Sequence, residues 1–293
     1  MHNKHEKICM VKDTDPKKAV NTVLDNLKGL EKRVSAHSHI LIKPNLGGGV
    51  AGEPGSHTSI GVVRAVLEAF SSFSLPVYIG EADGSFNSAD HMFSTLGIHE
   101  LGKHFNARVV NLSRGPSVDC AVPRPNRITS LRISTVFQHA FIVSLPVLKT
   151  HPWCAVTVSM KNMYGGVYQR EKAVLHTGLE ENIVDINKVI GAHLSIVDAT
   201  TAVVHGGFKY ALWVGCPPSK LDLVFAGYDF VAVDAVGTRI LDRNPDDIDY
   251  IRLAARHGLG TCNLEEMDIT GNGFPVKLLG KQGGGKISNK YFD

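Results

Sequence analysis

The sequence is poor in cysteine, and its cysteines are not spaced for metal or disulfide chemistry. They are scattered over 293 residues, odd in number and never in CxxC spacing: Cys9, Cys120, Cys154, Cys216 and Cys262. A disulfide framework needs paired cysteines, and a ferredoxin-type cluster needs closely spaced thiolates. We therefore expect neither in this chain, which has no iron–sulfur motif of its own.

Long apolar runs and clusters of one charge are also absent. No apolar run is long enough to span a bilayer, and the N-terminal sequence MHNKHEKICMVKD has no apolar core of signal-peptide length. The formal charge of +3 includes no basic run, so nothing indicates nucleic acid or an acidic membrane surface as a partner. These absences predict a cytoplasmic protein and leave its oligomeric state open.

Several enzyme motifs are missing as well. The glycine run 47–49 is not followed by the Lys-Ser/Thr of a P-loop, and GxGxxG does not occur. The absence of HExxH and GxSxG argues against a zinc peptidase and an α/β-hydrolase. What remains is an ordinary globular composition, 43% hydrophobic and 20% charged, which supports a substantial core.

Short β-rich runs alternate with amphipathic helical runs along most of the chain. This alternation predicts an α/β fold, with a largely parallel sheet and helices on both faces. We expect strands at 7–11, 39–43, 76–80, 141–148, 193–197 and 222–226, and helices at 16–27, 59–70, 88–105 (broken at Gly97), 152–163, 179–190, 230–241 and 246–256. Residues 1–275 would form one domain with a β-rich insertion near 107–134, a surface loop or lid at 206–218, and a mobile tail at 276–293.

Four of the apolar strands end in polar or charged residues. Ligands of open α/β sheets bind beyond the carboxyl ends of the strands, where such side chains could converge. The residues at these ends are Lys43 after HILI, Glu81 and Asp83 after PVYIG, Lys149 and His151 after FIVSLPVL, and Asp198 after LSIV. The alternative is that each residue caps a helix or faces water, and for any single residue the two interpretations are about equally good.

The stretch FIVSLPVLKTHPWCAVTVSMKNMYGG, residues 141–166, gives this hypothesis most of its detail. A residue before proline avoids helical geometry, so His151 fits an N-cap and Pro152 the first helical position. The N-terminus of such a helix would attract a phosphate or carboxylate. Lys161 could add a second cation, with Thr157 on the same helical face, and Asn162 a neutral donor; the alternative for Lys161 is an ordinary solvated lysine.

Histidine and aspartate supply the remaining candidates. His151 and His176 are candidates for proton transfer, because imidazole titrates near neutral pH. Asp229 is expected to cap the helix that follows it. Asp234 lies among valines and alanines, where a carboxylate must be paired or hydrogen-bonded, so we favour a supporting role over direct chemistry.

A metal site is a further hypothesis. Glu81, Asp83 and Asp198 offer the oxygen ligands that suit Mg²⁺ or a similar hard cation. Neither paired cysteines nor closely spaced histidines support zinc.

Four separated motifs resemble one known family. LIKPNL, LPVLKTH…KNMYGG, LSIVDA and AGYDFVAVDAVGTRIL occur in the order found in the family called domain of unknown function 362, over residues 40–260. In related proteins this domain is sometimes joined to ferredoxin-type iron–sulfur modules, whose cysteine clusters this chain lacks. The resemblance implies that the following residues are at characteristic family positions: Lys43, Asn45, Lys149, His151, Lys161, Asn162, Asp198, Asp229 and Asp234. It implies no particular reaction.

Three functions follow as hypotheses. The first is an enzyme that acts on a small carboxylate- or phosphate-bearing substrate by Lys/His acid–base chemistry, with or without a divalent cation. Its catalytic candidates are Lys149, His151, Lys161 and His176, and its substrate-binding candidates are Lys43, Asn45, Asn162 and Asp198. The second is a redox-associated protein that works with an iron–sulfur partner or an externally supplied metal cofactor. The third is a small-anion-binding protein without catalysis.

Overall fold

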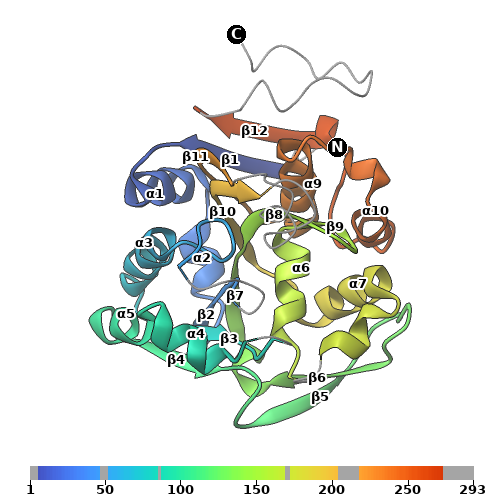
Figure 1. Cartoon of the computed structure of the whole chain (residues 1–293), viewed down its shortest axis with the longest axis horizontal. Helices are drawn as coiled ribbons and strands as arrows, with labels where there is room; N and C mark the ends of the chain where they lie inside the picture. The colour runs from blue at the N-terminus through green and yellow to red at the C-terminus, as the bar shows by residue number, and fades with distance from the viewer. Residues whose placement is uncertain (1–5, 47–51, 85–86, 169–171, 204–217, 273–293) are drawn as a thin grey trace.

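The computed structural model has the α/β architecture that the sequence predicts (Figure 1). It describes residues 6–46, 52–84, 87–168, 172–203 and 218–272. The glycine run 47–49, almost all of the expected lid at 206–218 and the expected tail at 276–293 lie outside these residues. No helix in the described ranges is long and apolar enough to cross a membrane.

One large sheet runs through the molecule. Its central strands β10, β7, β2, β3 and β4 are parallel neighbours, whereas β11 is antiparallel to β10 and to β1. In spatial order the main path is β12 (Met267–Gly271), β1 (Glu6–Lys12), β11 (Ser219–Gly227), β10 (Leu194–Val203), β7 (Ala140–Leu145), β2 (His39–Pro44), β3 (Val77–Glu81) and β4 (Ala107–Asn111). The short strand β8 (Val147–His151) continues beyond β7, pairs with β10 and forms a hairpin with β9 (Ala155–Thr157).

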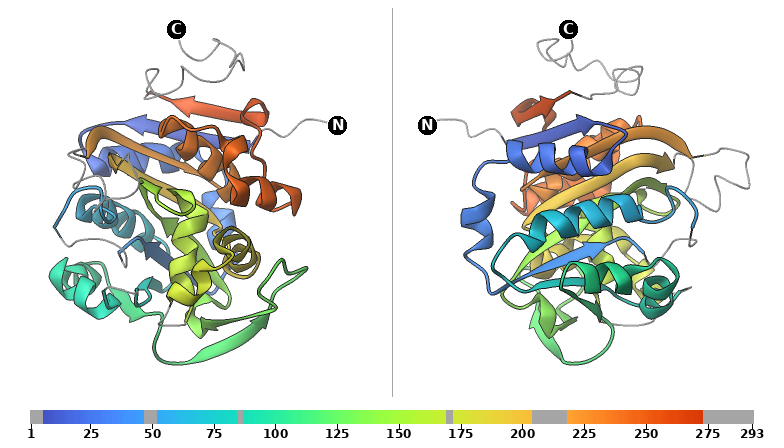
Figure 2. Two further views of the ribbon diagram at one scale, coloured as in Figure 1. Left: turned by 45° about the vertical axis from the view of Figure 1, so that its right-hand side comes forward. Right: turned by 90° about the vertical axis from the view of Figure 1, so that its left-hand side faces the viewer.

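Helices cover both faces of this sheet and make two separate apolar cores (Figures 1 and 2). One face carries α1 (Pro16–Asn26), α2 (Leu30–Val34), α3 (Ile60–Ser71), α4 (Ala89–Thr95) and α5 (Ile98–His104). The other carries α6 (Ser159–Met163), α7 (Leu179–Ile190), α9 (Phe230–Ile240) and α10 (Asp249–Arg256). Short 3₁₀ turns are η1 (Thr135–Phe137), η2 (Tyr164–Gly166), η3 (Lys172–His176), η4 (Pro245–Asp247) and η5 (Leu264–Glu266).

The helix starts follow from local sequence. At the start of α1, Asp15 precedes Pro16, and its side chain accepts the N–H of Lys17. At the start of α3, the side chain of Ser59 accepts the N–H of Val62. Gly97 has a φ of 68°, a left-handed conformation that separates α4 from α5 as the sequence predicts. Asp229 caps α9 by accepting the N–H groups of Val231 and Ala232, which confirms its expected role.

The expected insertion at 107–134 was placed too early. Residues 107–111 are β4, which pairs in parallel with β3 as the edge of the main sheet. The separate unit is only the antiparallel hairpin of β5 (Ser117–Ala121) and β6 (Ser130–Ser134). Its connection is fixed by buried Asp185 on α7, whose carboxylate accepts three successive backbone N–H groups, at residues 126–128.

The helix expected from Pro152 was also wrong. Residues 147–157 form the β8–β9 hairpin, and α6 begins only at Ser159. The side chain of His151 caps the hairpin turn instead of a helix, because its Nδ1 accepts the N–H groups of Trp153 and Cys154 at 3.2 and 3.4 Å. Thr157 and Lys161 therefore do not share a helical face. Alternating Val156 and Val158 of this stretch are fully buried and belong to the apolar core on the face of α6 and α9.

Candidate functional site

Lys43 ends β2 as a fully buried cation. Its Nζ lies 2.7 Å from Oε1 of Glu81, at the end of neighbouring β3, and donates to the carbonyl of Pro44 at 3.0 Å. Glu81 in turn accepts the N–H groups of Leu46 and Ala82, both at 2.9 Å. Burial lowers the pKa of Lys43 and the Glu81 carboxylate opposes that shift. The prediction that strand-end residues converge is confirmed for this pair.

A chain of side-chain amides connects Lys43 to Lys149 on β8. Asn162 Oδ1 accepts from Lys43 Nζ at 3.3 Å and from Asn45 Nδ2 at 3.1 Å. Asn45 Oδ1 then accepts from Lys149 Nζ at 3.0 Å, and the carbonyl of Ser56 accepts from the same ammonium at 2.7 Å. Four residues from three separate parts of the sequence thus form one polar network.

Two more lysines complete what we call the lysine cluster: Lys43, Lys149, Lys161 and Lys172. Lys161 on α6 lies over the ring of Tyr164, with Nζ 3.8 Å from the ring centroid. Lys172 on η3 is buried and donates to the carbonyl of Gly165 at 2.9 Å. Gly165 lets the backbone lie against the Lys43–Glu81 pair, because a Cβ there would lie 2.8 Å from Lys43 Nζ and 3.0 Å from Glu81 Oε1 and would displace them.

The lysine cluster carries more positive than negative charge. In the described ranges only Lys43 of the four is ion-paired, and the oxygens that accept hydrogen bonds from Lys149 and Lys172 are neutral. Burial, with repulsion from Lys161, lowers the pKa of Lys149 to about 8. Burial likewise lowers the pKa of Lys172 to about 7, against the attraction of Glu81. An anion bound here would restore the charged forms of both groups.

The two candidate histidines lie at the rim of the cluster. His151 and His176 both pack edge-on against Trp153, with centroid distances of 5.7 and 4.9 Å. Burial, together with Lys161 and Lys149, lowers the pKa of His151 to about 3. Since Nδ1 of His151 accepts backbone N–H groups, the neutral ring carries its proton on Nε2 and acts as a hydrogen-bond donor. Trp153 is 66% exposed, a large apolar side chain open to solvent beside the two histidines.

The carboxylates proposed as metal ligands have separate partners. Asp83 accepts from the N–H of Ala89 and from Asn111 Nδ2, both at 2.9 Å. Asp198 accepts the N–H of Ser59, at the start of α3, and is not at a strand end, because β10 continues to Val203. The described residues contain no group of three or more His, Cys, Asp or Glu side chains arranged to hold a metal ion. The hypothesis that Glu81, Asp83 and Asp198 bind a cation stays a prediction.

Asp234 holds the start of α6 in place by hydrogen bonds. It is fully buried on α9, where its carboxylate accepts the N–H groups of Ser159 and Met160 at the start of α6, and the hydroxyl of Tyr250 at 2.9 Å. Asp234 thereby fixes the helix that carries Lys161 and Asn162. The structure agrees with the supporting role that its apolar surroundings in the sequence suggest.

Lys172 was missed as a site residue in the sequence. It lies in a polar segment without regular periodicity, so no strand end or helix face marks it. The sequence feature that could have indicated it is the pair of glycines in MYGG, shortly before Lys172. Gly165 allows the backbone of this turn to lie close to the Lys43–Glu81 pair.

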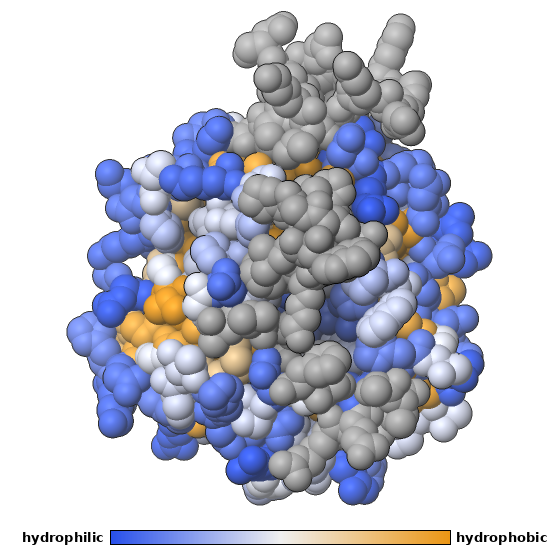
Figure 3. Space-filling view, in the orientation of Figure 1, coloured by the Kyte–Doolittle hydropathy of each residue, from blue (hydrophilic) through white to orange (hydrophobic). Residues whose placement is uncertain are grey.

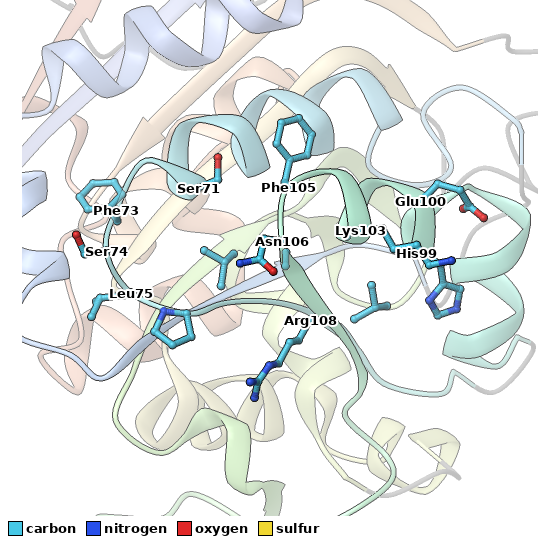
Figure 4. Close-up of a pocket in the computed structure, with 15 residues that line it drawn as sticks. Ser71, Phe73, Ser74, Leu75, His99, Glu100, Lys103, Phe105, Asn106 and Arg108 are labelled. Atoms are coloured by element: carbon cyan, nitrogen blue, oxygen red, sulfur yellow. The ribbon is translucent and has the colours of Figure 1, made fainter.

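Two hollows on the described surface lie at the opposite ends of the parallel strands from the lysine cluster. One of about 950 Å³ is lined by the end of α3, by α5 and by the first residues of β3 and β4 (Figure 4). The other surrounds the starts of β2 and β7, near His37 and His193. Both lie at amino ends of parallel strands, whereas the lysine cluster lies at the carboxyl ends. The face shown in Figure 3 is mostly hydrophilic, with an apolar patch on its left side.

Residues 40–239 match the family described as domain of unknown function (DUF362), more than half of the chain. The chain belongs to the DUF362 family. Its resemblance to that family is therefore confirmed, and the matched DUF362 region contains all four members of the lysine cluster together with Glu81, Asn45 and Asn162.

Three individual proteins are similar to this DUF362 chain, with sequence identities of 28% or less. The thylakoid-associated protein sll1697 of Synechocystis sp. (strain ATCC 27184 / PCC 6803 / Kazusa) is 28% identical over 257 residues, 84% of this chain and 76% of that protein. The lactate racemase apoprotein of Thermoanaerobacterium thermosaccharolyticum has a TM-score of 0.48 and 12% identity, over 75% of this chain and 54% of that one. A protein of Thermotoga maritima has a TM-score of 0.37 and 11% identity, over 84% and 60% of the two chains. This chain spans little more than half of the racemase chain.

Proposed function

We propose that the protein is an enzyme that binds a small carboxylate- or phosphate-bearing substrate at the lysine cluster. One observation carries the proposal: Lys149, Lys161 and Lys172 bring three amines to the buried end of the sheet, without carboxylate ion pairs in the described ranges. Burying unneutralised cations is costly. An anionic ligand offsets that cost, whereas an apolar ligand does not.

The same residues can move protons near neutral pH. Amines whose pKa values are about 8 and about 7, Lys149 and Lys172, exist partly as free bases at that pH, which suits general acid–base catalysis. His151, as a neutral Nε2–H donor, would polarise a carbonyl or phosphoryl oxygen rather than accept a proton. This differs from a proton-shuttling role and follows from its two backbone contacts.

Anion binding is measurable through Trp153. Titration with sulfate or malonate should change its fluorescence, in a Trp213→Phe background that removes the second tryptophan. Replacing Lys149 or Lys161 with Met should weaken binding roughly 10- to 100-fold each, because a hydrogen bond to a charged group contributes about 1.5–3 kcal/mol. Lys18→Met, on the exposed side of α1, is the matched control and should bind as the parent does. Parent-like affinity in both cluster variants would refute the proposal.

Variants of the two histidines distinguish an enzyme from a protein that only binds an anion. If His151→Ala and His176→Ala leave malonate affinity and every biological function of the protein unchanged, the non-catalytic anion-binding alternative replaces the enzyme. The redox-associated alternative rests on the fusions seen in the family and stays a prediction. A visible spectrum and metal analysis after anaerobic purification would test it.

A further inference from the structure

The environment of Lys149 differs from that of its ion-paired neighbour Lys43. Its Nζ has two neutral acceptors, Asn45 Oδ1 at 3.0 Å and the Ser56 carbonyl at 2.7 Å. A neutral amine has two hydrogens, so it can satisfy both acceptors and still present its lone pair. Lys43, held at 2.7 Å from Glu81, is kept as an ammonium and has no such lone pair.

The acceptor geometry around Lys149 is fixed by its neighbours. Asn45 donates from Nδ2 to Asn162 Oδ1, so its Oδ1 must face Lys149. Asn162 is oriented in turn because its Nδ2 donates to the Lys43 carbonyl at 3.0 Å and to Ser144 Oγ at 3.1 Å. Lys149 itself lies in the middle of β8, which pairs with β9 and β10, and is 9% exposed. The amine is therefore held in place while it remains within reach of a ligand.

Charged and titratable neighbours also favour the neutral amine. Lys161 on α6 repels the ammonium form, Glu81 on β3 attracts it more weakly, and His151 on the same strand is neutral. A lysine desolvated beside another cation is a recognised way of making an amine nucleophilic.

We propose that Lys149 is a nucleophile that forms an imine with the carbonyl carbon of a 2-oxo acid. This inference rests on the proposed anion-binding function of the same cluster. The Lys149 nitrogen adds to the carbonyl carbon to give a carbinolamine, and a proton passes from nitrogen to oxygen. Loss of the hydroxyl with a second proton releases water and leaves the C=N bond, so no oxidant or reductant is consumed.

The carboxylate of a 2-oxo acid explains why this substrate class fits. Protonation of the imine makes a second cation beside Lys161, which is unfavourable unless an anion lies between or beside them. A carboxylate bonded to the carbonyl carbon supplies that anion at the required place. A neutral ketone or aldehyde supplies no such charge.

Borohydride trapping tests this assignment. Pyruvate and sodium borohydride are added together to the full-length protein, and the modified lysine is located by peptide mass spectrometry. The imine is reduced by hydride to an N-(1-carboxyethyl) adduct, which we expect on Lys149 in at least about tenfold excess over exposed Lys18, as an activated amine should give. Malonate should suppress the adduct, and Lys149→Arg, shown to be folded by its thermal unfolding, should lack it.

A second variant distinguishes an activated amine from an accidental one. Lys161→Met removes the repelling cation, so the pH of half-maximal trapping at Lys149 should rise. An adduct on Lys172 or Lys161 in place of Lys149 would overturn the assignment. If pyruvate and malonate alter Trp153 fluorescence but no adduct forms, the imine is refuted and anion binding stands. If neither ligand alters fluorescence and no adduct forms, both proposals are refuted.

Discussion

Glu81→Gln is expected to lower the free energy of unfolding by about 3–5 kcal/mol, the usual cost of breaking a buried ion pair by removing one partner. The side chains of Lys43 and Glu81 are 1% and 3% exposed, so water cannot replace the lost charge. The two carboxylate oxygens of Glu81 accept hydrogen bonds from Leu46 N–H, Ala82 N–H and Lys43. Glutamine has only one oxygen that can accept them. Urea unfolding at neutral pH measures the difference.

The control for Glu81→Gln is to remove both charges. Lys43→Met combined with Glu81→Leu leaves no unpaired ion, and buried pairs replaced by apolar residues of similar volume often cost little. The double variant should therefore recover a large part of the stability lost in Glu81→Gln. A double variant at least as unstable as the single one would show that the backbone contacts of Glu81, not its charge, dominate.

Asp234→Ala is the second large effect, and it should reach the site as well as the fold. The substitution leaves the buried donors of Ser159, Met160 and Tyr250 without their acceptor. Unsatisfied buried donors cost about 1–3 kcal/mol each, and because α6 can relax we expect a total of about 3–5 kcal/mol. Malonate affinity should fall too, since α6 carries Lys161. Tyr250→Phe, which removes one donor and leaves the helix start intact, should bind malonate normally.

The pH dependence of stability provides an independent check on Asp234. Burial raises its pKa to about 7 from an ordinary value of 3.8, against the three hydrogen bonds that favour the carboxylate. The folded state therefore binds the proton more tightly than the unfolded state, so the Asp234 contribution to stability falls as pH rises from about 4 to about 7. Asp234→Asn should flatten the stability–pH curve in that window. An unchanged slope would contradict the raised pKa.

The sequence predicts the fold well where one physical signal dominates. Strand-end residues Lys43 and Glu81 are adjacent in the structure because parallel strands β2 and β3 end at the same edge. Asp229 caps its helix, as its position before an apolar run predicts. Such inferences depend only on neighbouring residues and on strand polarity.

The errors arise where tertiary contacts override local preference. Pro152 suits a helix start, yet residues 155–157 pair with β8, and the buried hairpin keeps Val156 in the core. The polarity of Asp198 suggests a strand end, but its carboxylate accepts the N–H of Ser59, the residue that caps α3, while β10 continues past it. Lys172 joins the cluster by donating to the carbonyl of Gly165, whose backbone lies against the Lys43–Glu81 pair. Hydrophobic periodicity along the sequence does not predict such a contact.

Proton uptake on anion binding tests the lysine cluster most directly. At pH 8, near the lowered pKa of Lys149 and above that of Lys172, both amines are partly neutral. A bound anion favours their charged forms, so binding of sulfate, which does not itself titrate there, should take up about one proton. Calorimetry in buffers of different ionisation enthalpy measures this number. We expect proton uptake at pH 8 that falls toward zero at about pH 6, because the lysines of the unbound protein are already charged there. Binding without proton uptake at pH 8 would contradict it.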